Sequence, residues 1–135
     1  MTGDVTTDGH PAVTTKISQL SFADTVSRLQ SLLSARGMKV FAVIDQRAEA
    51  RSASLDLRAT TLVLFGNPAA GTPVMAAAPL AALDLPLRVL IWADGDEVKV
   101  SYVAPTELSR RYSLSTDLTA RLAGIDQLTD ALVTP

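Results

Sequence analysis

Apolar residues early in the chain follow the period of an amphipathic helix. Four of them recur at spacings of four, three and four positions, on what would be one face of a helix: Phe22, Val26, Leu29 and Leu33. Ser21 precedes this stripe, and Asp24 stands three positions after the serine, which is close to a capping box at a helix start. Gly37 lies where a left-handed residue often ends a helix. The pattern predicts a helix over residues 22–36.

Runs of β-branched and apolar residues predict five strands, at residues 13–19, 38–45, 60–67, 86–92 and 98–103. The run from Thr60 to Phe65 is apolar after its two threonines, which is typical of a central strand covered on both faces. Pro68 has no backbone N–H, so we expect it to end that strand. Asp94-Gly95-Asp96 is a turn signal, and the last two strands should therefore form an antiparallel hairpin.

The segments between and after these strands predict further helices, at residues 46–55, 72–83, 105–111 and 115–132. In the second of these, Thr72 would cap the helix, Pro73 would occupy its first turn and Pro79 would break or kink it. The order β-α-β-α-β-α-β-β-α-α fits an α+β two-layer sandwich. We expect helices packed on one face of a mixed β-sheet that contains the C-terminal β-hairpin. This single domain would span residues 13–135, after a poorly ordered leader at residues 1–12.

Composition narrows the chemistry. With 47% hydrophobic and 19% charged residues, the chain has enough apolar material for a core. Its net charge of -2 and 4% aromatic residues argue against a nucleic-acid partner, because such binders usually carry a basic excess. The chain has no cysteine, and its one histidine, His10, lies in the leader. Thiolate chemistry, zinc ribbons and iron–sulfur clusters are thereby excluded, and we expect no metal and no cofactor.

The sequence predicts a cytoplasmic, soluble protein with no membrane partner. The leader has neither a basic start nor an apolar stretch, so it is not a signal peptide. The longest mainly apolar stretch, residues 73–83, is too short to span a membrane and contains Pro79.

Four segments, in this order, resemble one known protein family: VFAVID, LVLFGNPAAGTPVM, LDLPLRVLIW and VSY. The family is the bacterial and archaeal domain of unknown function 302, and the likeness extends from about Thr15 to Tyr112. The FGNP stretch followed by GTP, with DLPL downstream, is its most specific part. The resemblance implies a small α+β domain with a mixed sheet, often found as a homodimer. It implies no established activity.

Two positions depart from the pattern of that family. Members similar to this chain often carry a histidine after the aspartate of VFAVID, and another after a pair of basic residues near the C-terminus. This chain has Gln46 and Tyr112 there. If those histidines bind a metal or shuttle protons in relatives, this chain lacks both.

Polar side chains at the ends of two predicted strands form a candidate site. Asp45 ends one strand and Asn67 ends the next. If these strands are parallel neighbours, both side chains lie at one edge of the sheet, where α/β proteins commonly bind ligands. Glu49, four positions after Asp45, would face the same side of the following helix. Such a group could bind a cation or a polar metabolite, or could use its two carboxylates as acid and base.

The same residues can also be explained by purely structural roles. Asp45 could cap the next helix, and Asn67 could make an Asx turn. The loop from Gly66 to Thr72 joins a strand to a helix start, so an anion could bind at Thr72. That loop lacks the lysine and glycine spacing of a Walker motif, and it could instead be a tight turn. Four apolar residues could line a pocket or a dimer groove, or belong to the core: Met75, Leu80, Leu83 and Leu85.

Two functions remain open. The first is a non-catalytic homodimeric module that binds a small polar ligand or a partner protein, because the sequence shows no nucleophile–base pair, metal cluster or cofactor motif. The alternative is a small enzyme that uses Asp45 and Glu49 as acid and base, with an oxygen-ligated divalent cation. The tentative ligand-binding residues are Asp45, Glu49, Asn67 and Thr72.

Overall fold

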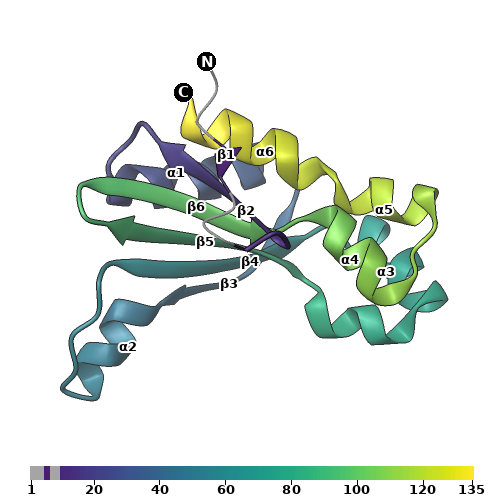
Figure 1. Ribbon diagram of the computed structural model, residues 1–135, viewed down its shortest axis with the longest axis horizontal. Coiled ribbons are helices and arrows are strands. Elements are labelled where there is room, and N and C mark those ends of the chain that lie inside the picture. The colour runs from purple at the N-terminus through teal and green to yellow at the C-terminus, as the bar shows by residue number, and fades with distance from the viewer. Residues whose placement is uncertain (1–4, 7–9) are drawn as a thin grey trace.

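One antiparallel sheet forms the centre of the fold (Figure 1). The computed structural model describes residues 5–6 and 10–135, and the expectation of a poorly ordered leader falls mostly on residues outside these. The strands are β1 (Val5–Thr6), β2 (Val13–Ser18), β3 (Lys39–Asp45), β4 (Thr60–Gly66), β5 (Leu87–Asp94) and β6 (Glu97–Val103). Their order in the sheet is β1-β2-β6-β5-β4-β3, and each neighbouring pair is antiparallel.

The expectation of a mixed sheet was therefore wrong. A parallel pair needs a connection that crosses the face of the sheet, usually a helix. The connection from β3 to β4 instead holds the short helix α2 (Gln46–Ser52), which lies beyond the ends of these two strands (Figure 1). The chain then turns back, so β4 runs beside β3 in the opposite direction.

The remaining helices occupy two places. The long helices α1 (Phe22–Ala35) and α6 (Gly124–Val133) cover one face of the sheet (Figure 1). At one end of the sheet lie α3 (Pro68–Ala77), the 3-10 helix η1 (Pro79–Asp84), α4 (Pro105–Tyr112) and α5 (Thr116–Leu122). Packing on one face, as expected from the sequence, thus holds for α1 and α6 only.

Local signals explain where the elements begin and end. The Ser21 hydroxyl accepts a hydrogen bond from the Asp24 N–H at 3.1 Å, and Gly37 follows α1 with a φ of +68°. In the β5–β6 hairpin, Asp94 pairs with Glu97, and Gly95 has a φ of +59°. Asp96, the second loop residue, has no positive φ, and this combination is the pattern of a type II′ turn. The strand pairing confirms the predicted hairpin.

Two predicted helices differ from the structure. The helix expected from Thr72 begins one turn earlier, because Asn67 caps it and Pro68 occupies its first position. The helix expected over residues 115–132 is divided into α5 and α6, which meet at Ala123 and Gly124.

The strand β4 is buried on one face rather than both. Thr61, Val63 and Phe65 point toward α1 and α6 and are buried, while the residues between them are half-exposed. The alternation shows that an unbroken apolar run does not by itself mean two covered faces, since the side chains of a strand point alternately to opposite faces.

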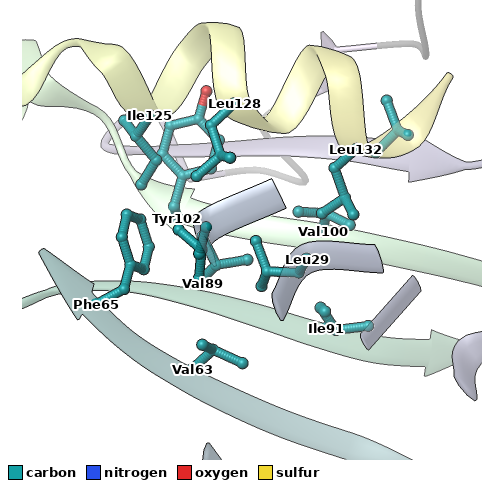
Figure 2. Close-up of a cluster of buried hydrophobic side chains, with 12 residues drawn as sticks. Leu29, Val63, Phe65, Val89, Ile91, Val100, Tyr102, Ile125, Leu128 and Leu132 are labelled. Carbon is teal, nitrogen blue, oxygen red and sulfur yellow. The ribbon is translucent and has the colours of Figure 1, made fainter. Parts of the chain in front are cut away.

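The main core lies between the sheet and the two long helices. Figure 2 shows side chains from α1, β4, β5, β6 and α6 meeting there. A second, smaller cluster lies among the end helices and consists of Val74, Ala81, Leu108, Leu114 and Leu122. Leu87, at the start of β5, packs against both clusters.

A buried lysine joins β2 to α6. Lys16 is only 3% exposed, and its ammonium donates to the Asp126 carbonyl at 2.9 Å and to the Thr129 hydroxyl at 2.7 Å. It also forms an ion pair with the Asp130 carboxylate at 2.8 Å. The ring of Tyr102 lies 5.4 Å from the ammonium, and its hydroxyl points toward α6 (Figure 2). Burial, and then the hydrogen bond to Asp126, raise the pKa of Tyr102 above its ordinary value.

Candidate functional site

An apolar cavity lies where the two clusters of buried side chains meet. Its volume is about 550 Å³, and it is bounded by the ends of β3, β4 and β5 and by α3 and α5. Its lining includes Phe65, which belongs to the main core, and Leu122, which belongs to the smaller cluster. The lining residues are Met38, Phe41, Phe65, Gly66, Asn67, Pro68, Ala70, Gly71, Thr72, Met75, Leu85, Pro86, Leu87, Arg121 and Leu122.

The end of β4 shapes one side of this cavity. The Asn67 side chain accepts a hydrogen bond from the Ala69 N–H at 3.0 Å, and Pro68 then starts α3. The first turns of α3 contribute small residues, among them Gly71, which leave space in front of the strand ends. A Cβ added at Gly71 would lie 4.0 Å from the Met75 methyl group, so this position could carry a side chain without a clash. The predicted tight turn is in fact helix.

Few polar residues line the cavity. They are Asn67, Thr72 and Arg121, and all three are exposed. Arg121 lies in the last turn of α5, and no other lining residue carries a charge. Outside the lining, the Lys39 ammonium lies 5.0 Å from the centre of the Phe41 ring. The lining is thus mainly apolar, and its one charged residue is positive.

The predicted site residues do not come together. Asn67 and Thr72 line the cavity, but Asp45 and Glu49 do not. Because β3 and β4 are antiparallel, Asp45 pairs with Thr61, whereas the opposite end of β4 pairs with Lys39. Asp45 and Asn67 therefore lie at opposite ends of the sheet, and the expectation that they share one edge was wrong.

The structure gives Asp45 a local role. Its Oδ1 accepts a hydrogen bond from the Ala48 N–H at 2.9 Å, which caps α2. Both Asp45 and Glu49 are exposed. Within the described residues, no three histidine, cysteine or acidic side chains gather as a possible metal site.

Replacing Asp45 by alanine should lower the free energy of unfolding by about 1 kcal/mol, because an uncapped N–H remains at the start of α2. Urea unfolding measures this change. Glu49→Ala is the matched control, since it removes a carboxylate of the same helix without removing a cap, and we expect less than about 0.5 kcal/mol. An unchanged stability together with a lost activity or cation affinity in Asp45→Ala would instead support the acid–base hypothesis.

Only two of the four apolar residues that the sequence suggested for a pocket line the cavity. Met75 and Leu85 line the cavity, whereas Leu80 and Leu83 are exposed on η1, with Leu80 at 70%. Sequence reasoning missed Met38, Phe41 and Arg121. No local signal marks these residues, because they reach the cavity only through the packing of β3 and α5 against the end of β4.

Tyr112 takes part in a polar network between α4 and η1. Its hydroxyl donates to Asp84, which also accepts from Arg111 at 3.1 Å. Hydrogen bonds from Arg110, and then from Arg111, lower the pKa of Glu107 to about 2. The hydrogen bond to Asp84 raises the pKa of Tyr112.

The two positions at which the resemblance implies histidines are far apart. Gln46 begins α2, and Tyr112 ends α4. Figure 1 places these helices at opposite ends of the sheet. Histidines at these two positions of one such chain would not share a site.

The architecture defines the chain as a small α+β domain with an antiparallel sheet and an apolar cavity at one end. Residues 13–132 match the model of the family described as domain of unknown function DUF302. The chain belongs to this family. A crystal structure of an uncharacterized conserved protein DUF302 from Bacillus stearothermophilus has the same fold, with a TM-score of 0.77 over 91% of this chain and 96% of that one. The two sequences are 18% identical.

Curated relatives carry a more specific name. The chain is 40% identical over 98 residues to fluoride-specific ion channel FluC 1 of Brucella suis biovar 1 and to FluC 2 of Brucella melitensis biotype 1. These matches cover 72% of this chain but only 39% and 36% of the relatives. The chain thus spans less than two fifths of their length. No helix in the described part of the chain is long and apolar enough to cross a bilayer.

Proposed function

We propose that this chain is a non-catalytic module that binds a small, largely apolar molecule in the cavity between α3, α5 and the strand ends. The observation that carries the proposal is the cavity itself. Its volume of about 550 Å³ lies within the range of small-molecule sites, about 300–1,000 Å³. Its lining has the composition of such sites, mainly apolar with a few polar groups.

The lining changes the expected ligand from polar to apolar. A polar molecule would lose its hydration against walls such as Phe65, Leu87 and Leu122 and would gain few hydrogen bonds in return. The same reasoning makes fluoride, the ion named for the curated relatives, an unsuitable occupant, because an isolated ion is costly to desolvate.

The chemistry around the cavity supports binding rather than catalysis. Asn67, Thr72 and Arg121 supply an amide, a hydroxyl and a guanidinium, and no acid or histidine stands among the lining residues to act as a base. The alternative enzyme would have to use Asp45 and Glu49, which lie on the other side of the molecule and are exposed.

Filling the cavity should abolish binding. We expect Met75→Trp to weaken the binding of N-phenyl-1-naphthylamine, a neutral apolar fluorophore, at least about tenfold, because the larger side chain occupies the space that the probe needs. Probe fluorescence measures the affinity. Leu80→Trp is the matched control: it adds the same side chain at a position that is 70% exposed, and it should bind like the wild type. Equal affinities for the wild type and Met75→Trp would contradict the proposal.

We also propose that a second copy of the chain is its partner. The strand β3 lies at the edge of the sheet and exposes large apolar side chains, among them Val43 at 43%. Such an edge can pair with an identical one, and two-fold homodimers are the commonest oligomers. Light scattering of the wild type should give the mass of two chains, twice 14.2 kDa. The variant Val43→Lys should give the mass of a single chain. A wild-type mass of one chain at every concentration would contradict the proposal.

A further inference from the structure

We propose that the ligand of the cavity is an apolar monocarboxylate, with its carboxylate paired to Arg121 and its apolar part inside. This inference rests on the proposed function, since it names the class of molecule for the same cavity.

The lining of the cavity carries a single charge, and it is positive. Arg121 is the one charged residue of the lining, and no hydrogen bond or ion pair ties its guanidinium to another described residue. Lys39 lies beside Phe41, another lining residue, but is not itself part of the lining. Arg121 therefore attracts an anionic group and repels an ammonium group.

The guanidinium favours a carboxylate in particular. It presents a planar fork of donors that matches the two oxygens of a carboxylate. The Asn67 Oδ1 accepts a hydrogen bond from the Ala69 N–H, and the NH₂ group of the same side chain can donate to a ligand. The Thr72 hydroxyl can also donate. The polar groups of the cavity are thus donors suited to acceptor oxygens.

One arginine against apolar walls limits the charge of the ligand to one. A phosphate monoester is close to doubly charged at neutral pH. Arg121 would neutralise half of that charge, and any part of the remainder that entered the apolar lining would be an unpaired charge that is costly to desolvate. A monocarboxylate leaves no such excess. Burial of its apolar part against Phe65 and Leu87 removes apolar surface from water, which favours binding.

Three probes with the same eight-carbon tail and different head groups test the inference: octanoate, octanol and octylamine. Isothermal titration calorimetry measures their affinities for the full chain at neutral pH and low salt. We expect octanoate to bind at least about tenfold more tightly than octanol, and octylamine to bind more weakly than both. In Arg121→Met the preference for octanoate over octanol should disappear. In Arg47→Met, which removes an arginine from α2 outside the cavity, the preference should persist.

The outcomes separate the two proposals. Equal affinities of octanoate and octanol, or a preference for octanoate that survives in Arg121→Met, would overturn the carboxylate inference and leave the apolar cavity as the ligand site. No binding of any tail, together with no effect of Met75→Trp on N-phenyl-1-naphthylamine, would overturn the proposed function as well. A folded Arg121→Met, checked by circular dichroism, keeps the comparison meaningful.

Discussion

Replacing Leu29 by alanine is expected to lower the free energy of unfolding by about 3–4 kcal/mol. Leu29 is fully buried in the main core, where α1 faces β5 and α6 (Figure 2). The substitution removes apolar surface from the core and leaves a cavity among its closely packed side chains, which cannot all move to fill it. Urea unfolding followed by circular dichroism measures the change.

Leu80→Ala is the control for this experiment. It removes the same atoms from a side chain that is 70% exposed on η1, and we expect a change within about 0.5 kcal/mol. Similar losses for the two variants would mean that the sheet face covered by α1 and α6 is not the main core of the protein.

The second large effect concerns the buried lysine between β2 and α6. Asp130→Ala should lower the free energy of unfolding by about 2–3 kcal/mol. Lys16 is 3% exposed, so loss of its carboxylate partner leaves a buried ammonium with only neutral acceptors, the Asp126 carbonyl and the Thr129 hydroxyl. The expected loss of stability is smaller than for a fully buried ion pair, because Asp130 itself is 44% exposed.

Lys16→Met should cost less than Asp130→Ala, and this order tests the explanation. The methionine fills the space of the lysine stem without a charge, and the exposed Asp130 regains its water. Thr129 keeps a partner, because its hydroxyl also donates to the Ile125 carbonyl at 2.7 Å. Chemical denaturation of both variants measures the two losses. If Lys16→Met were the more damaging, then its ammonium would stabilise the fold through contacts other than the ion pair.

The parts of the fold that depend on neighbouring residues were predictable from the sequence. The helix α1 has its apolar stripe, its Ser21 cap and its Gly37 end within sixteen residues or so of one another, and the structure confirms it. The β5–β6 hairpin follows from its two-residue turn, in which Gly95 can adopt the positive φ that such turns need. Family membership was predictable for the same reason, since it rests on contiguous segments.

The direction of β4 was not predictable in this way. A helix between two strands fits a crossover and also a return at the strand ends, and the difference depends on where α2 packs. The direction of β4 determines which residues can share a site, because the antiparallel pairing places Asp45 and Asn67 at opposite ends of the sheet. Arg121 was missed because it follows Asn67 by more than fifty residues, and only the packing of α5 beside α3 brings the two to one cavity.

The most direct test of the account is whether an apolar probe enters the cavity. The chain has three methionines, and two of them line the cavity: Met38, which directly precedes β3, and Met75 of α3. Methyl-labelled methionine NMR, with signals assigned through Met38→Leu and Met75→Leu, reports contact at both walls. The account predicts that N-phenyl-1-naphthylamine shifts both signals along one binding curve. Saturation of the protein with the probe while both signals stay unmoved would contradict it.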